Sequence, residues 1–292
     1  MHVFVAGATG AVGSLLVPML LEAGHTVTGT SRSPAGVERI ERLGATGLRV
    51  DALDAERLRG AVRAAAPEAV VHQLTDLSGA DAAANSRIRR EGTRNLVDAA
   101  KAAGVGRVVA QSISWAYGPG DDPADEAVPL DSTAAQPRAR MVAAVRALEE
   151  TVAEVETAVV LRYGLLYGPG TWYAPGGAFA AALAGDRSTP FLGSTAANDA
   201  VGSFVHVADA AGAALAALDW PGGPVNVVDD EPSPARVWLP VLAEALGVPA
   251  PAPEAGRQDW ERGALNGLAR SRGWRPAWPT WRNGFAALRL PS

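Results

Sequence analysis

Short apolar runs alternate with stretches of helical periodicity through the first half of the chain. The runs are rich in Val and Ala and lack the polar alternation of half-exposed strands, so they indicate strands covered on both faces. Between the first two runs, Leu16, Leu20 and Leu21 follow helical spacing and end at Gly24, which suits a left-handed helix cap. This repetition of strand and helix predicts a parallel sheet with right-handed crossovers. The predicted strands are 3–6, 26–30, 47–50, 69–74, 107–111 and 158–162.

After Tyr163 the pattern becomes irregular, and Gly, Pro and Trp become common. The sequence predicts helices at 208–218 and 236–246, and loops at 168–177, 185–200 and 229–236. We therefore expect an α/β fold, a Rossmann-type doubly wound parallel sheet with a smaller C-terminal substrate-binding lobe. The expected division is a dinucleotide-binding lobe at 1–165, to which 200–228 returns, and a substrate lobe at 166–292.

The composition narrows the function. A formal net charge of −5 and dispersed arginines give no electrostatic footprint for nucleic acid or an anionic membrane. The chain has no cysteine, which excludes disulfides and thiolate chemistry, and Lys101 is its only lysine. No His, Asp or Glu cluster has the spacing of metal ligands, so no metal is expected. A strand-like run starts beside Met1 and no apolar run is long enough to span a bilayer, so we expect a cytoplasmic protein.

A glycine-rich turn, GATGAVG at 7–13, joins the first predicted strand to the first predicted helix. In a dinucleotide-binding turn, the first glycine permits the tight turn, the second lets the backbone approach a pyrophosphate, and the third lets the helix pack on the strand. The start of the helix then offers unpaired N–H groups to the phosphates. The strand–turn–helix context predicts a bound dinucleotide, and the alternative is a connection without a ligand.

The residues after the second strand bear on which dinucleotide is bound. NAD sites place a carboxylate there for the ribose 2′-hydroxyl, but this chain has Ser31, Arg32 and Ser33. A guanidinium binds phosphate through two hydrogen bonds, so this trio suits the 2′-phosphate of NADP. The alternative is that Arg32 is an ordinary solvated arginine. The sequence favours NADP over NAD.

Seven segments, in the same order along the chain, resemble the extended short-chain dehydrogenase/reductases, which include NAD(P)-dependent epimerases and dehydratases. The glycine turn resembles the TGxxGxxG motif of that family. The other segments are VDAL at 50–53, VVHQLT at 70–75, EGTRNLVDAA at 91–100, LRYGLLYGPG at 161–170, SFVHVAD at 203–209 and a C-terminal segment at 265–285 that contains GWRP. The resemblance implies that 50–53 contacts adenine and that the fourth strand runs beside the cofactor. The cofactor contacts expected are Gly7, Thr9, Gly10, Ala11, Val12, Gly13, Ser31, Arg32, Asp51, Ala52, Leu53, Leu74 and Thr75.

The residues that carry the chemistry of this family are missing. That chemistry uses a Ser or Thr, and a Tyr followed four residues later by Lys. Residues four apart lie on one helix face, so the lysine can lower the pKa of the tyrosine. In this chain the residues four positions after each tyrosine are different: Tyr117 is followed by Asp121, Tyr163 by Tyr167, Tyr167 by Thr171 and Tyr173 by Gly177.

The helix expected to carry the pair is 137–155. Counting back from Glu149, which matches a downstream family position, puts Met141 in the place of the tyrosine and Val145 in the place of the lysine. An apolar stripe at helical spacing indicates a core contact or a homodimer interface. It consists of Met141, Val145, Leu148, Val152 and Val155. The family serine is also replaced, because Ile113 stands at its offset, between Ser112 and Ser114.

Three functions stay open. The first is an NADP-dependent reductase, epimerase or dehydratase that acts on a small organic molecule without the Tyr–Lys pair. Its candidate catalytic groups are Ser112, Ser114, Tyr117 and Tyr167, which stand near the expected carboxyl ends of strands. The second is a non-catalytic NADP-binding sensor or scaffold. The third, a sugar-nucleotide epimerase, fits least, because the substrate lobe has no lysine and no grouped arginines for a diphosphate.

Overall fold

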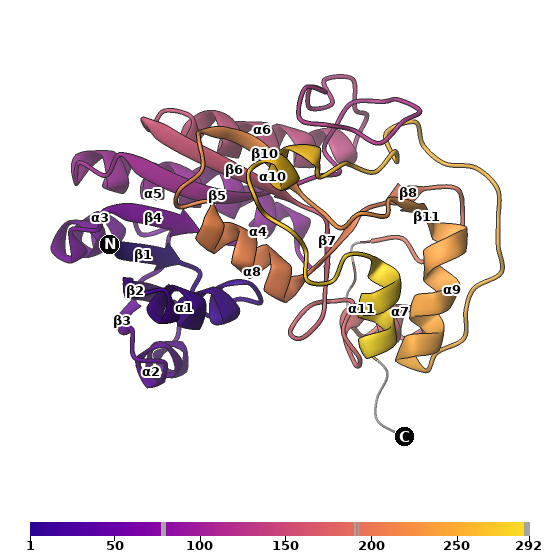
Figure 1. Ribbon diagram of the computed structural model, residues 1–292, viewed down its shortest axis with the longest axis horizontal. Helices are drawn as coiled ribbons and strands as arrows, with labels where there is room; N and C mark the ends of the chain where they lie inside the picture. Colours follow the sequence, from indigo (N-terminus) through magenta and orange to yellow (C-terminus); the bar gives the residue numbers. More distant parts are fainter. Residues whose placement is uncertain (77–79, 190, 192, 289–292) are drawn as a thin grey trace. The chain divides into compact units, whose positions relative to one another are not determined.

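The structure is a computed structural model that describes residues 1–76, 80–189, 191 and 193–288 (Figure 1). Its contacts cluster into two compact units, which are described one after the other. The first unit comprises Met1–Ser112, Ala135–Leu161 and Ala211–Pro224. The second comprises Ile113–Ala134, Arg162–Ala210 and Val225–Ser292.

A seven-stranded sheet forms the centre of the first unit, in the order β10-β6-β5-β4-β1-β2-β3. The registers pair β1 in parallel with β2 and β4, β2 with β3, and β4 with β5. The chain order reverses beside β1, which is the switch point where open α/β sheets bind ligands. The strands are β1 His2–Ala6, β2 Thr26–Ser31, β3 Thr46–Arg49, β4 Ala69–His72, β5 Arg107–Ile113, β6 Thr157–Tyr163 and β10 Gly223–Val227.

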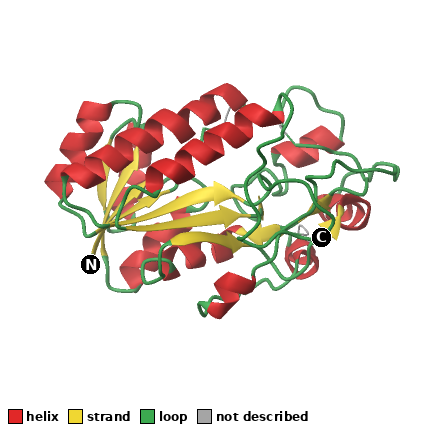
Figure 2. Cartoon of the chain, turned by 90° about the horizontal axis from the view of Figure 1, so that it is seen from above, coloured by secondary structure: helices red, strands yellow, loops and turns green. Residues whose placement is uncertain are grey.

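Helices lie on both faces of this sheet (Figure 2). On one face α3 packs against α5 and α5 against α6, and their apolar sides bury a core around Phe4, Val70, Leu96, Val108 and Leu148. Apolar strands covered on both sides explain the absence of polar alternation in the sequence. The helices are α1 Gly13–Glu22, α2 Pro34–Arg42, α3 Ala55–Ala65, α4 Ala82–Arg87, the π-helical turn η1 Ile88–Gly92, α5 Thr93–Ala102, α6 Arg138–Val152 and α8 Val207–Ala216.

The second unit has an aromatic core. Tyr173 stacks on Phe179 with ring centroids 4.7 Å apart, and Phe204 meets Trp238 edge-on at 4.9 Å. Two small sheets pair β7 with β9 and β8 with β11. The elements are β7 Leu165–Tyr167, α7 Ala178–Leu183, β8 Val201–Gly202, β9 Phe204–His206, β11 Ser233–Pro234, α9 Ala235–Leu246, α10 Gly267–Ser271 and α11 Trp281–Ala287.

The predicted fold class is confirmed, and each of the six predicted strands corresponds to an observed one, β1 to β6. The predicted helices at 208–218 and 236–246 correspond to α8 and α9. The seventh strand, β10, was not predicted, because it begins within a Pro-Gly-Gly run and contains a further proline and a polar Asn226. Residues 113–134, which we expected in the dinucleotide-binding lobe, cluster with the second unit.

Candidate functional site

The glycine turn is closed by two contacts that leave no room for a side chain. Gly7 has a φ of 89°, and a Cβ added to it would lie 2.6 Å from the carbonyl oxygen of Gln73, directly after β4. A Cβ on Gly13 would collide with the carbonyl oxygen of Gly7. These two glycines therefore hold β1, the start of α1 and the end of β4 close together.

Gly10 serves a different purpose, because the protein itself does not need a glycine there. It is exposed, and the nearest atom to an added Cβ would be the carbonyl oxygen of Gly7, at 3.5 Å. Among the described residues, the N–H groups of Ala11, Val12 and Gly13 donate to no acceptor. An open backbone with free N–H groups at a helix start is the donor set that a pyrophosphate requires.

The end of β2 presents one outward cation. Ser31 is buried and accepts the N–H of Ser33 at 3.3 Å, while Ser33 caps α2 by accepting the N–H of Gly36 at 3.1 Å. Both hydroxyls thus serve local turns. Arg32 is exposed and donates to Asp76 at 3.2 Å. An exposed ion pair of this kind contributes little stability, so the guanidinium is available to a ligand.

The residues expected beside adenine form a rigid turn after β3. Asp51 accepts the N–H of Leu53 at 2.9 Å, and the carbonyl of Ala52 accepts from the Asn95 side chain at 2.9 Å. Ala52 is buried in the core of the first unit, while Asp51 is exposed. The turn can therefore offer a carboxylate and a half-buried Leu53 to a planar base.

The segment after β4 is fixed in the same way. Leu74 donates its N–H to Nδ1 of His72 at 3.2 Å, and its carbonyl accepts from the side chain of Gln111 at 2.8 Å. Thr75 follows, exposed. His72 was not predicted as a site residue, and it supports the segment that we expected beside the cofactor. The available signal was its position in the VVHQLT segment, close to the carboxyl end of a predicted strand.

The end of β5 and helix α6 carry no Ser–Tyr–Lys arrangement. Ser112 is buried and donates to Oε1 of Glu149 on α6 at 2.7 Å, so its hydroxyl is committed to that helix. Met141 is half-buried and Val145 is 1% exposed. The apolar stripe continues through Leu148 into the core of the first unit, which favours core packing over the homodimer interface as its explanation.

The other candidate catalytic residues lie in the second unit. Ser114 is buried, and its N–H donates to the carbonyl of Tyr163 at 2.9 Å. Tyr117 is 1% exposed, donates to Asn226 at 2.6 Å, and has its pKa raised to about 12 by burial. Tyr167 is fully buried, and burial, together with Asp229, raises its pKa further. Neither tyrosine is set up to exchange a proton near neutral pH.

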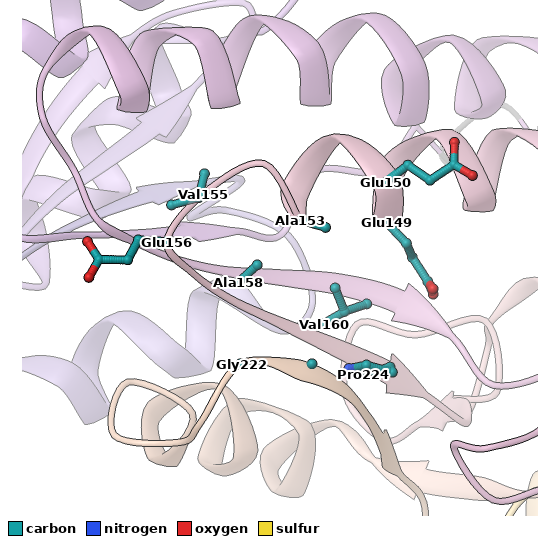
Figure 3. A pocket seen from close by; sticks show the side chains of 10 residues that line it. Glu149, Glu150, Ala153, Val155, Glu156, Ala158, Val160, Gly222 and Pro224 are labelled. Carbon is teal, nitrogen blue, oxygen red and sulfur yellow. The ribbon is translucent and has the colours of Figure 1, made fainter.

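A shallow pocket lies elsewhere, at the edge of the sheet (Figure 3). It is lined by α6, β6 and the start of β10, and β6 stands three strands away from β1 in the sheet. Glu149, Glu150 and Glu156 line it, which disfavours the anionic cofactor. The described residues contain no cluster of His, Asp or Glu able to hold a metal ion. Within the same ranges, no helix has the length and apolar content needed to cross a bilayer.

Comparison with known proteins decides the family. A profile of the NAD dependent epimerase/dehydratase family matches residues 3–227, which spans the glycine turn and the complete sheet. The chain belongs to this family. The resemblance found in the sequence, to the extended short-chain dehydrogenase/reductases, is thereby confirmed.

Individual members of the family differ in what they do. A Streptomyces sp protein named 3-diazoavenalumate denitrifying reductase is 44% identical over 310 residues, covering 98% of this chain and 99% of that protein. The Thermus thermophilus UDP-glucose 4-epimerase, solved in complex with NAD, is 27% identical over the full length of both chains, with a TM-score of 0.75. The Campylobacter jejuni UDP-Glc/GlcNAc 4-epimerase has a TM-score of 0.76 at 18% identity, over 98% of this chain and 97% of that one, which shows the shared fold.

This family membership confirms the expected class, an enzyme of the nicotinamide dinucleotide-dependent epimerase/dehydratase type. The observed cradle fits that cofactor: Gly10 and the free N–H groups of α1 would hold the pyrophosphate, and the turn at Asp51 would meet the adenine. The family is NAD-dependent, and the Thermus relative was solved with NAD.

Proposed function

We propose that this chain is a reductase that replaces an aromatic diazonium group by hydrogen and releases N2. The observation that carries the proposal is the loss of the whole proton-transfer set. Ile113, Met141 and Val145 stand at the positions of the family Ser, Tyr and Lys. The 44% identical Streptomyces relative, matched along nearly the full length of both chains, is named as a reductase of a diazo compound.

The chemistry of such a substrate explains why the proton-transfer set is dispensable. The bound reduced nicotinamide supplies a hydride. An arenediazonium cation that gains a hydride and loses N2 becomes a neutral arene, and the charge balances without any proton. Epimerases and ketone reductases must instead move a proton to or from oxygen, for which they need an acid or base. Apolar side chains at these positions are then sufficient.

The same substrate is a strong electrophile that couples to phenolates, amines and thiolates, and this chain exposes few of them. It has no cysteine, and its single lysine, Lys101, is paired with Glu154 at 2.8 Å. All four tyrosines are at most 7% exposed. Burial raises the pKa of Tyr117, Tyr167 and Tyr173, which keeps the reactive phenolate form scarce. These features would limit covalent modification of the protein by its own substrate.

NADP is the form of the cofactor that we propose. No carboxylate stands at the end of β2 to accept from a 2′-hydroxyl, and Arg32 is exposed there. Arg49 lies close, with its Nε donating to the carbonyl of Arg32 at 3.3 Å, so two guanidinium groups are near the expected 2′-phosphate. The carboxylate of Asp76 pairs with Arg32 and so opposes a preference for NADP. This ion pair would have to break before Arg32 could bind the 2′-phosphate.

An isotope experiment tests the reaction. The protein is incubated with ring-diazotised 3-aminocinnamate and NADPH, with a protein-free control because dihydronicotinamides reduce diazonium salts slowly by themselves. We expect N2 release, NADPH oxidation and cinnamate as product. With NADPH deuterated at C4, deuterium should enter the ring, whereas in D2O with unlabelled NADPH it should not. Deuterium taken from D2O, or no oxidation above the control, would reject the proposal; the latter result would favour the sensor or scaffold.

A homodimer and a cytoplasmic location stay predictions. Size-exclusion chromatography with light scattering on the purified chain would test the first, and cell fractionation the second.

A further inference from the structure

Arg89 is a buried arginine for which the described residues supply no hydrogen-bond or ion-pair partner. The residue is 8% exposed and lies in the π-helical turn η1. Among the described residues, no carboxylate or other acceptor bonds to its side chain. Its neighbours differ: Arg87 pairs with Glu91 at 2.7 Å, and Arg94 pairs with Glu154 at 2.6 Å. Arg89 therefore differs from both of these paired arginines.

The side chain faces the end of β4. Asn85 stands four residues earlier and is buried as well, so the two share one face of the helix. The side chain of Asn85 accepts the N–H of Asp76 at 3.1 Å, which turns this face toward the segment that follows β4. The charge of Arg89 also lowers the pKa of His72, the last residue of β4, although burial of that ring is the larger cause.

The local backbone supports a functional role. π-Helical turns are uncommon and occur frequently at functional sites. Here the turn runs from Ile88 to Gly92, interrupts the helical path between α4 and α5, and packs against α6. Helix α6 is the element that carries Met141 and Val145, where the family places its Tyr and Lys. One side of η1 therefore packs against the helix on which the family carries its Tyr and Lys.

A buried cation without a counter-ion is costly. Transfer from water is unfavourable unless an opposite charge and hydrogen bonds compensate. Burial lowers the pKa of Arg89 to about 10, so the group stays protonated at neutral pH. An oxyanion delivered by a ligand would supply both the charge and the acceptors, in the geometry that a guanidinium prefers.

We propose that Arg89 is an oxyanion-binding residue of the ligand site beside β4, which receives either a phosphate oxygen of the cofactor or the carboxylate of a substrate such as the diazotised cinnamate. The second source rests on the proposed function, and the first does not. In both cases Arg89 binds and positions the ligand, and no proton transfer is assigned to it.

Calorimetry on the purified 292-residue chain separates the two sources. The variants are Arg89→Met, Arg89→Lys and the matched control Arg90→Met, which alters an exposed arginine on the same turn. Each is titrated with NADP+. The NADP+ complex is then titrated with cinnamate, an unreactive acid, and with cinnamide, which lacks the charge. No arm depends on turnover, so failure of the proposed reaction would not affect the result.

If a phosphate is the partner, Arg89→Met should weaken NADP+ binding about 10- to 100-fold, the usual effect of losing a charge-assisted hydrogen bond. If the carboxylate is the partner, Arg89→Met should leave NADP+ binding unchanged and weaken cinnamate binding about 10- to 100-fold. Cinnamide binding should then be unchanged. Arg89→Lys should restore part of the loss, and Arg90→Met should match the wild type.

Thermal unfolding without ligand gives an independent readout. Removal of an unpaired buried cation should raise the melting temperature of Arg89→Met by a few degrees, whereas removal of a structural arginine would lower it. Should Arg89→Met fail to fold, Arg89→Gln takes its place in every arm. Dissociation constants within twofold of the wild type for NADP+ and cinnamate, or a lowered melting temperature with unchanged binding, would overturn the proposal.

Discussion

Nε2 of His72 lies 2.8 Å from the hydroxyl of Thr93, while Nδ1 of the same ring accepts the N–H of Leu74 at 3.2 Å. Because Nδ1 is an acceptor, the ring is neutral and carries its proton on Nε2, which donates to Thr93. The imidazole therefore ties β4 to α5 and fixes the segment after β4, which we expect beside the cofactor. Burial, with a smaller contribution from the charge of Arg89, lowers the pKa of His72 to about 4.

This relationship predicts an acid-sensitive fold. The folded pKa lies below the unfolded value of 6.5, so the unfolded state binds the proton more readily and stability falls as the pH drops from 7 to 4. His72 alone should contribute a loss of about 3 kcal/mol across that window. Urea unfolding of wild type and His72→Gln at pH 7 and 4 measures it, and a parallel decline in the two proteins would contradict the assignment.

Asp229 predicts the opposite dependence. The carboxyl is 1% exposed, and burial raises its pKa to about 8. Between pH 4 and 8 the native state binds the proton and the unfolded state does not, so this group reduces stability as the pH rises. Asp229→Asn keeps an acceptor for the N–H of Glu231 and should stabilise the protein by about 2 to 4 kcal/mol at pH 8.

The control for Asp229→Asn is the same comparison at pH 4. There the native carboxyl is protonated and the unfolded one, with its ordinary pKa of 3.8, is close to half protonated, so the gain should fall below about 1 kcal/mol. Glu231 is a neighbouring carboxylate that pairs with Arg282 at 2.8 Å. The substitution Glu231→Gln should not reproduce this pH profile. A gain that is equal at pH 4 and 8 would exclude the ionisation of Asp229 as its cause.

The glycines of the first turn should separate folding from cofactor binding. Gly10→Ala has space for its methyl group, so the melting temperature should change by less than about 2 °C, while NADP+ binding weakens about tenfold because the methyl occupies the phosphate approach. Gly13→Ala should unfold or lose several kcal/mol, because its Cβ meets the carbonyl oxygen of Gly7. Calorimetry and thermal unfolding check both, and equal effects of the two substitutions would refute this division.

Arg32 should set the preference between NADP and NAD. Arg32→Ala should weaken NADP+ binding about 10- to 100-fold and leave NAD+ binding within twofold, because only NADP carries the 2′-phosphate. Asp76→Asn should strengthen NADP+ binding, because it frees the guanidinium from its 3.2 Å ion pair. Fluorescence titration of both cofactors measures these constants. Identical losses for NAD+ and NADP+ in Arg32→Ala would show that the residue does not face the 2′ position.

Much of the fold follows from local patterns. Val-rich runs without polar alternation predicted the buried strands, and the glycine spacing at 7–13 predicted a turn that the structure explains by two close backbone approaches. The absence of a Tyr-x-x-x-Lys pair was also evident, since it requires only a count along the chain. These features depend on periodicity and spacing, which a linear sequence carries in full.

The sequence did not show in which direction the candidate side chains point or which of them are buried. Ser112 and Ser114 were equal candidates by position, but the strand register turns the hydroxyl of Ser112 to Glu149 on α6. Tyr117 and Tyr167 stood beside loops in the sequence and are buried in the structure. Nothing in the sequence distinguishes Arg89 from the arginines beside it, whereas packing leaves it buried and without a partner among the described residues.

The sequence alone thus determined the parallel sheet, the glycine turn and the missing acid–base pair, because each is written in the spacing of neighbouring residues. The tertiary structure decided which hydroxyls and charges are committed, buried or available. Those properties depend on contacts between residues far apart in the chain, such as Arg32 with Asp76 or Ser112 with Glu149, and on the loss of water around them.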